Sequence, residues 1–337
     1  MRVLLLICIG IIFIEASRAR PKPSMDFGAL LNITKAMDAK AHVRSSLPGP
    51  EDFPRVGDVV ILVGDVSCVI SNVLGTGTNS KVFEGECGPT KYGVALKYQF
   101  SESSSEDVSL VQKDWDFLSL MQGTTGFPKV FHISPVGKYR GSRYPFQYVV
   151  MEKVGVSLRQ YAGQGLSAQE LIPLILQVVS RLEAIHRKGF YFGDVHLENI
   201  MVKSSTAYLL DFGRAGAFMY SDGSLVPNER VVLSPSKNIR YLSPAELNNG
   251  RLSRRDDIFR LAEVAVRACA DTQASYSSFV RENARTQSGL AEAKLTAPLR
   301  EILRGLHPNL QSFYDYAREL KYEDAPDYEH IRSILKL

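Results

Sequence analysis

The chain has little cysteine, little net charge and almost no long hydrophobic runs. Its 337 residues include four cysteines and carry a formal net charge of +4. Such a small charge excess, without interleaved aromatic and basic residues, argues against a nucleic-acid-binding protein. The cysteines show no paired spacing and no close histidine, which gives no case for zinc. No internal stretch is apolar for long enough to span a bilayer, so we expect no transmembrane segment.

The longest apolar run lies at the N-terminus. Arg2 precedes apolar residues 3–14, and small or polar residues follow at 16–19. A positive start, an apolar run of this length and an exit of small residues are typical of a signal peptide. We therefore predict a signal peptide over residues 1–19 and a secreted, lumenal or vacuolar protein. The alternative is a buried strand or helix.

Residues 20–56 are expected to form an extension before the main domain. Prolines bracket a segment whose apolar residues have the spacing of one amphipathic helix, which we expect to pack on its own domain rather than on a membrane. These apolar residues are Phe27, Leu30, Leu31, Met37 and Ala41. Within the segment, Asn32-Ile33-Thr34 is a glycosylation sequon that requires an exposed Asn32.

The middle of the chain contains an Asp and an Asn five positions apart, followed by an Asp-Phe-Gly. They are Asp194, Asn199 and Asp211. Phosphoryl transfer needs one carboxylate that orients the attacking hydroxyl, and oxygen ligands for a divalent cation that bridges the nucleotide phosphates. The pattern resembles the catalytic and metal loops of protein kinases. Asp194 is therefore a predicted catalytic residue, and Asn199 and Asp211 are predicted ligands of Mg²⁺ or Mn²⁺.

Upstream of these loops lie a glycine-rich segment and a lysine. Gly75 and Gly77 separate two β-rich runs, and their missing Cβ atoms would let the backbone approach phosphate oxygens. Ser80 takes the place of the usual third glycine. Lys97 ends the run Val-Ala-Leu-Lys, which resembles the third strand of kinases, so we expect Lys97 to pair with the α- and β-phosphates of ATP. Taken singly, the glycines suit an ordinary turn and Lys97 suits a strand edge.

Three further segments follow in colinear order. Residues 151–158 read MEKVGVSL, residues 253–257 read SRRDD, and the C-terminal segments 313–320 and 325–328 read FYDYAREL and APDY. They resemble the hinge, the start of the buried αF helix and the closing helices of the casein kinase 1 group, including its vaccinia-related and tau-tubulin branches. The resemblance covers roughly residues 60–337. It implies an α+β, bilobal protein-kinase fold and a Ser/Thr protein kinase acting on protein substrates.

The resemblance also assigns roles to further residues. It makes Met151 the gatekeeper, places the adenine at residues 152–154, and makes Asp257 a structural brace of the catalytic loop. The group holds anions at basic residues near the activation segment and favours acidic or pre-phosphorylated substrates. Arg240 is the matching position here, within a charged cluster that also contains Lys237, Arg251, Arg254 and Arg255. The predicted nucleotide-binding residues are Gly75, Thr76, Gly77, Ser80, Val82, Ala95, Lys97, Met151, Glu152 and Val154.

Two departures from the kinase pattern concern regulation and the partner of Lys97. Phe192-Gly193 stands where many kinases have His-Arg before the catalytic Asp. The missing Arg is one that grips a phosphorylated activation loop, so we expect activity that does not depend on that phosphorylation. Asp114 aligns with the glutamate that pairs with the strand lysine, and Asp116 is the alternative partner.

A third departure is His196, which replaces a lysine that places positive charge on the transferred phosphoryl group. Imidazolium can supply that charge and neutral imidazole cannot. Because the reference pKa of histidine is about 6.5, we expect activity to rise as the pH falls from about 7.5 toward 6. The alternative is a histidine that only makes local hydrogen bonds.

Two other functions remain open. The sequence Gly-Asp-x-His-x-x-Asn also resembles the catalytic loop of aminoglycoside and choline phosphotransferases, which act on small molecules. A secreted pseudokinase that serves as a scaffold is the third possibility, because Ser80, Asp114 and His196 all depart from the usual residues. A fold alone does not decide among these functions.

Strand and helix periodicities indicate the two lobes. Alternation and turn residues predict a five-stranded antiparallel lobe with one helix over residues 57–152, and helical periodicity predicts a helical lobe over 153–337 with a core helix at 168–187. If residues 74–82 form a hairpin, Cys68 and Cys87 lie nearly opposite each other, and we predict a disulfide unless the register slips by one residue. Cys269 is expected in the core of the αF helix. The oligomeric state is not defined by the sequence.

Overall fold

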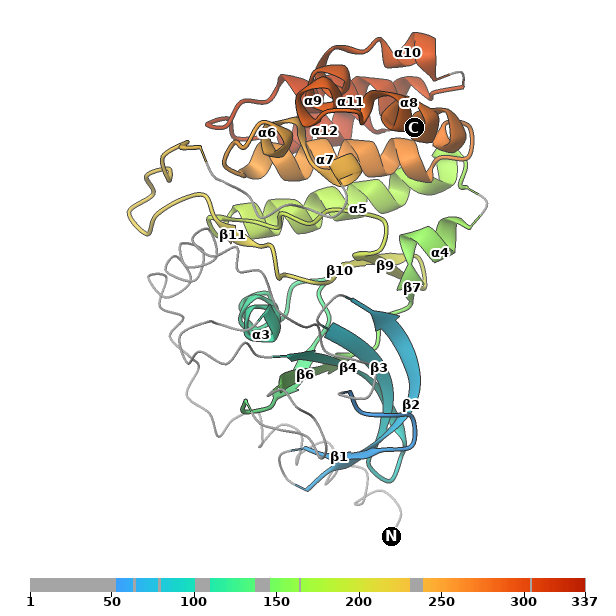
Figure 1. Cartoon of the computed structure of the whole chain (residues 1–337), viewed down its shortest axis with the longest axis vertical. Helices are drawn as coiled ribbons and strands as arrows, with labels where there is room; N and C mark the ends of the chain where they lie inside the picture. Colours follow the sequence, from blue (N-terminus) through green and yellow to red (C-terminus); the bar gives the residue numbers. More distant parts are fainter. Residues whose placement is uncertain are drawn as a thin grey trace.

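The structure of the protein is a computed structural model with two lobes, a β-rich lobe and a larger helical lobe (Figure 1). It describes residues 53–62, 65–77, 80–100, 110–136, 146–163, 165–230, 239–303 and 305–336. The predicted signal peptide, the predicted amphipathic helix and the Asn32 sequon lie outside the described residues. The α+β bilobal fold that the sequence predicts is confirmed.

The smaller lobe is built on one antiparallel sheet with the strand order β1-β2-β3-β4-β6-β5. The prediction of five strands was wrong by one, because residues 59–61 pair with β2 and add a three-residue edge strand. One helix, α3 (Leu110–Leu120), lies beside the sheet, as the sequence predicts (Figure 1). The strands are β1 (Val59–Ile61), β2 (Ser67–Thr76), β3 (Ser80–Cys87), β4 (Tyr92–Phe100), β5 (Val130–Ile133) and β6 (Phe146–Glu152).

The hairpin of β2 and β3 has the register that places its two cysteines opposite each other. Cys68 pairs with Cys87 across the strands, and the two form a disulfide, so that prediction is confirmed. Both cysteines are buried in a cluster that includes Ile70 and Phe83. The disulfide thus closes the base of the hairpin whose other end is the glycine loop. Cys269 is a free, buried cysteine that directly follows the αF-type helix α7.

Two long helices form the centre of the larger lobe. The helix α5 (Ala168–His186) is capped by Ser167, whose hydroxyl and backbone exchange hydrogen bonds with Glu170 in a capping box. The helix α7 (Arg254–Ala268) is buried on nearly all sides and packs against α5. The other helices are α4 (Leu158–Ala162), α6 (Pro244–Leu247), α8 (Gln273–Asn283), α9 (Gln287–Thr296), α10 (Leu299–Ile302), α11 (Pro308–Glu319) and α12 (Tyr328–Ile334), with a 3₁₀ turn η2 (Ile239–Tyr241).

Short strands at the boundary of the lobes carry the loops that matter for chemistry. A three-stranded sheet has the order β10-β9-β7, and a two-stranded sheet pairs β11 with β8. The segment between β8 and β9 contains the predicted catalytic loop, and the segment between β10 and β11 contains Asp211-Phe212-Gly213. These strands are β7 (Val156–Ser157), β8 (Phe190–Tyr191), β9 (Ile200–Lys203), β10 (Thr206–Leu209) and β11 (Gly216–Ala217).

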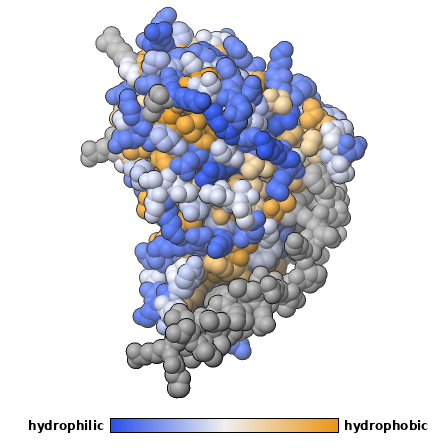
Figure 2. Space-filling model, turned by 180° about the vertical axis from the view of Figure 1, so that it is seen from behind, coloured by the Kyte–Doolittle hydropathy of each residue, from blue (hydrophilic) through white to orange (hydrophobic). Residues whose placement is uncertain are grey.

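The surface mixes polar and apolar residues. Figure 2 shows hydrophilic residues over much of the visible face, with hydrophobic residues in patches between them. Among the described residues, no helix combines the length and the apolar character needed to cross a membrane.

The disulfide generates a prediction about stability. Its cysteines are 19 residues apart, and closing a loop of that size in the unfolded chain stabilises the folded protein by about 3 kcal/mol. We expect reductant, or the double substitution Cys68→Ala with Cys87→Ala, to lower the free energy of unfolding by that amount in denaturant titrations. Reductant should not affect the double variant further. Recovery of both cysteines as free thiols in non-reducing peptide maps would contradict the disulfide.

Candidate active site

One buried carboxylate binds the backbone of the predicted catalytic loop. Asp257, near the start of α7, accepts hydrogen bonds from the backbone N–H groups of Phe192 at 2.6 Å and Gly193 at 2.7 Å, and it lies 2.9 Å from His186 Nε2. Gly193 has a φ of +73°, and a Cβ there would lie 2.6 Å from the carbonyl oxygen of Arg214. Glycine is therefore required, because a side chain would meet both backbone strain and a clash.

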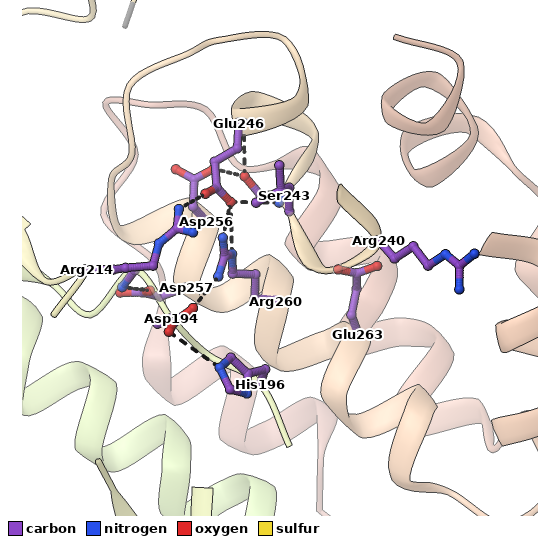
Figure 3. Close-up of polar contacts among 12 residues, drawn as sticks. Asp194, His196, Arg214, Arg240, Ser243, Glu246, Asp256, Asp257, Arg260 and Glu263 are labelled. Atoms are coloured by element: carbon purple, nitrogen blue, oxygen red, sulfur yellow. Dashed lines mark hydrogen bonds and ion pairs between the residues drawn. The ribbon is translucent and has the colours of Figure 1, made fainter. Parts of the chain in front are cut away.

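The carboxylate of Asp194 is contacted through both of its oxygens. Asn199 Nδ2 donates to Oδ2 at 3.0 Å, and His196 Nε2 lies 3.4 Å from the same oxygen. Arg260 Nη1 lies 3.5 Å from Oδ1 (Figure 3). Burial alone would raise the pKa of Asp194, but the hydrogen bond from His196 and the charges of His196, Arg260 and Arg214 lower it to about 2. Asp194 is thus ionised at neutral pH, as a group that orients a substrate hydroxyl must be.

Lys97 lies on β4 and forms two ion pairs that link the lobes. Its ammonium is 2.7 Å from Asp114 Oδ2 and 2.9 Å from Asp211 Oδ1. The predicted pairing with Asp114 is confirmed, whereas Asp116 accepts a hydrogen bond from Gln112 at 2.9 Å. Burial would lower the pKa of Lys97, but the two carboxylates outweigh that effect and raise it. The lysine therefore keeps its charge throughout the physiological range.

In the metal loop, Asp211 faces Lys97 and Phe212 packs against α3. Phe212 stacks on Phe117 with a centroid distance of 5.6 Å and meets Phe192 edge-on at 5.1 Å. Its backbone N–H donates to Asp114 Oδ1 at 2.7 Å. Asp211 has a φ of +67°, which is costly for a non-glycine residue and is often found where a functional side chain is held in place. In kinases, this orientation of the aspartate and the lysine ion pair are both needed for catalysis.

The glycine loop joins the end of β2 to the start of β3. Gly75 lies opposite Val82, and a Cβ on Gly75 would have no atom within 4 Å, so the loop is open on that side. A Cβ on Gly77 would instead lie 2.7 Å from Ser80 Oγ. The Ser80 side chain thus lies directly beside Gly77.

The residues predicted to contact the adenine lie on β4 and β6 and just beyond β6. Ala95 pairs with Met151 across the two strands, and both side chains are buried. Val82 packs against the same core and pairs with Lys97 from the side of β3. Of the predicted nucleotide-binding residues, the structure therefore brings Val82, Ala95, Lys97 and Met151 onto neighbouring strands. Glu152 ends β6, Val154 is buried just beyond it, and Thr76 is exposed at the end of β2.

The donor set fits a nucleotide-bound divalent cation. Asp211 leaves 44% of its side chain exposed, whereas the other two members of its ion-pair cluster, Lys97 and Asp114, leave 9% and 1%. Both side-chain hydrogen bonds of Asn199 use Nδ2, which leaves its Oδ1 available to a cation. Within the described part of the chain, no group of three or more His, Cys, Asp or Glu could hold a metal alone. A cation here would thus be bound by oxygens of Asp211, Asn199, water and the phosphates together, a ligand set that Mg²⁺ prefers.

His196 lies between two carboxylates. Its Nδ1 is 3.0 Å from Glu198 Oε2, and its Nε2 faces Asp194. Burial would lower the pKa of His196, but the hydrogen bonds and charges of Asp194 and Glu198 raise it to about 9. The imidazolium charge therefore does not change between pH 7.5 and 6, and the expected rise in activity over that range, which rested on an unshifted pKa, is not supported.

Of the predicted basic cluster, Arg254 and Arg255 lie beside the C-terminal segment at residues 322–323. Figure 3 shows the Arg240 side chain directed away from Asp194, and that side chain is exposed. Arg254 lies 4.4 Å from the ring centroid of Phe218 and donates to the carbonyl of Glu323 at 3.1 Å. Arg255 stacks on Tyr322, near the same C-terminal segment. Lys237 lies outside the described residues.

Sequence reasoning placed Glu246 in a stretch that partly matches the wider kinase pattern, but it missed the contacts that Glu246, Arg214 and Arg260 make near Asp194. Arg260 contacts the catalytic carboxylate, and Glu246 joins Arg260 to Arg214, which follows the metal loop (Figure 3). One signal was present in the sequence. Arg260 is three residues beyond Asp257 on a helix, so the two share a face.

Comparisons with known proteins agree with this geometry. Residues 68–314 match the protein kinase domain family, so the chain belongs to the protein kinase family. Casein kinase I homolog 3 of Schizosaccharomyces pombe is 24% identical over 274 residues, which cover 79% of this chain and 60% of that protein. Casein kinase I homolog 1 of the same yeast is 23% identical over 274 residues, covering 77% and 58%. The chain thus spans about 60% of the length of these curated relatives, and within the protein kinase family it is similar to casein kinase I homologs.

The Lys97–Asp114 ion pair predicts that substitution of Asp114, but not of Asp116, lowers the activity. We expect Asp114→Asn to lower kcat/KM for ATP by about 10- to 100-fold, because buried Lys97 loses one of its two charged partners. Asp116→Asn, on the same helix, should stay within about twofold of the wild type because it leaves that pair intact. Steady-state kinetics with varied ATP make the measurement. Equal effects of the two substitutions would contradict the assignment.

The raised pKa of His196 predicts a particular pH profile. The imidazolium is present below its pKa of about 9 and is lost as the pH rises through that value. We expect kcat/KM to be constant between pH 6 and 7.5 and to fall as the pH approaches 9, whereas His196→Lys should retain activity to higher pH. His196→Gln should be low at every pH. A rise toward pH 6 that is absent from His196→Lys would contradict this assignment.

Proposed function

We propose that the protein is an active Ser/Thr protein kinase that transfers the γ-phosphate of ATP to protein hydroxyls. The single observation that carries the proposal is Lys97, which contacts Asp114 of α3 and Asp211 of the metal loop at the same time. This contact needs the helix, the strand and the metal loop in their active positions together. Similarity to casein kinase I homologs supports Ser and Thr as acceptors.

The residues have separate tasks in this proposal. Lys97 binds the α- and β-phosphates beneath the loop at Gly75–Ser80, and Asp211 and Asn199 hold the divalent cation. ATP with its cation supplies the transferable phosphoryl group. Asp194 orients the acceptor hydroxyl, and His196 contributes positive charge beside it. Proximity and orientation account for much of the rate of such a reaction, because phosphoryl transfer needs little covalent chemistry from the protein.

Activity without activation-loop phosphorylation is part of the proposal. Phe192-Gly193 provides no arginine to bind a phosphate. Arg214, just after the metal loop, instead pairs with Glu246 of α6 at 2.5 Å. This ion pair joins the two ends of the activation segment. The guanidinium of Arg214 therefore already has a carboxylate partner, Glu246, and needs no phosphate. The exposed Arg240 is the residue that we propose to favour acidic or pre-phosphorylated substrates.

We also propose that the protein acts in the secretory pathway. The N-terminal pattern of residues 1–19 supports it. The Cys68–Cys87 disulfide supports it independently, since disulfides persist mainly in oxidising compartments.

Phosphate transfer from labelled ATP tests the proposed function. Secreted protein lacking residues 1–19 is incubated with Mg²⁺ or Mn²⁺ and casein, beside an aminoglycoside and choline as small acceptors. We expect labelled Ser or Thr in casein, and Asp194→Asn and Asp211→Asn should each reduce transfer by about 10²- to 10⁴-fold. Labelled aminoglycoside or choline alone would favour the small-molecule reaction. Cation-dependent ATP binding without transfer, or the absence of both, would favour a scaffold.

A further inference from the structure

Arg260 is a buried arginine at the centre of the larger lobe. It belongs to α7, and its side chain is only 2% exposed. Nε donates to Glu246 Oε2 at 3.0 Å, and Nη2 donates to the same oxygen. The remaining amino group, Nη1, lies 3.5 Å from Asp194 Oδ1. One guanidinium thus contacts two carboxylates on different sides, which its planar, forked shape allows.

Glu246 fixes that guanidinium. Its carboxylate is buried in α6, and Oε1 pairs with Arg214 at 2.5 Å while Oε2 also accepts from the backbone N–H of Ser243 at 2.9 Å (Figure 3). With all these donors, Glu246 has a single orientation, and so does Arg260. The contact of Arg260 with Asp194 therefore comes from a rigid group.

We propose that Arg260 is a positioning residue for Asp194, holding Oδ1 so that the carboxylate has one orientation toward the acceptor hydroxyl. Asn199 and His196 contact Oδ2, and Arg260 contacts Oδ1 from the opposite side. A carboxylate contacted at only one oxygen can rotate about its χ2 bond, a broad torsion. Loss of that orientation lowers the rate of transfer without weakening nucleotide binding.

The same contact links the activation segment to the catalytic loop. Arg214 follows the metal loop directly and pairs with Glu246 of α6, and Glu246 in turn pairs with Arg260. The helix α7 thus supports the catalytic loop twice, with Asp257 at its backbone and Arg260 at its carboxylate. The inference rests on the proposed kinase function, because it concerns the orientation of the same Asp194.

A purely structural arginine makes a different prediction from a positioning one, and two substitutions separate them. Arg260→Lys retains a buried charge for Glu246 but has a single ammonium, which cannot also contact Asp194. Glu246→Gln removes one buried charge but keeps an amide oxygen that can accept from Nε and Nη2, so the guanidinium stays beside Asp194. Arg260→Met combined with Glu246→Gln removes both buried charges and protects the test if a single variant fails to fold. Arg187→Lys, on a pair where the arginine is 77% exposed, is the matched control.

We expect Arg260→Lys to lower kcat by about 10- to 50-fold with KM for ATP within about twofold, and to change Tm little. Glu246→Gln should lower Tm further than Arg260→Lys and reduce kcat by no more than about threefold. The double variant should have a kcat as low as that of Arg260→Lys, and Arg187→Lys should match the wild type.

Two results would overturn the inference. One is a wild-type kcat in Arg260→Lys and in the double variant. The other is a loss of kcat that follows Tm across all the variants, which would make Arg260 structural only. Neither result touches the proposed kinase function, which would fail only if the wild type itself transferred no phosphate to protein. A crystal structure of Arg260→Lys gives a readout independent of activity, in which we expect the Asp194 carboxylate to rotate.

Discussion

The buried carboxylate of Asp257 is the interaction on which the rest of the structure depends. Burying a carboxylate is costly unless hydrogen bonds replace its water, and here two backbone N–H groups and His186 do so. His186 in turn contacts the hydroxyl of Tyr328 at 2.5 Å. The catalytic loop, the helix α5 and the C-terminal segment are thereby joined at the start of α7. This is why segments far apart in the sequence contribute to one site.

Two clusters of charged residues then position the predicted catalytic groups at the boundary of the lobes. Lys97 with Asp114 and Asp211 holds the β-rich lobe to the metal loop. Around Asp194 and Glu246, arginines balance the carboxylates inside the larger lobe. In each cluster every charged group has an opposite partner, which is the condition for keeping charges buried. The more exposed acid of the first cluster, Asp211, is also the one with oxygen left for a cation.

Much of this arrangement could be predicted from the sequence, because it depends on spacing along one or two elements. The catalytic and metal loops are local, and the opposition of Cys68 and Cys87 follows from the length of one hairpin. The pairing of Asp114 with Lys97 could be predicted from a helix position. The sixth strand could not, because a three-residue strand has too short a pattern to be distinguished from a loop.

The properties that sequence reasoning missed arise from tertiary neighbours. The pKa of His196 is set by the hydrogen bonds and charges of Asp194 and Glu198 together with burial, and the packing of the two carboxylates around the ring is not visible in the motif. Glu198 is itself fixed by an ion pair with Arg159 of α4, 39 residues away in the sequence. A histidine in place of lysine thus looks like a loss of charge in the motif and is a retained charge in the fold.

The departures from the kinase pattern are therefore better understood as a set than one by one. Gly193 removes an arginine before Asp194, while Arg260 brings a guanidinium to the same carboxylate from the helix below. His196 removes a lysine, but its neighbours keep the imidazole protonated. Positive charge thus lies beside Asp194 on two residues, His196 and Arg260. Counting missing motif residues would suggest an inactive protein, whereas the positive charges beside Asp194 support the proposed phosphoryl transfer.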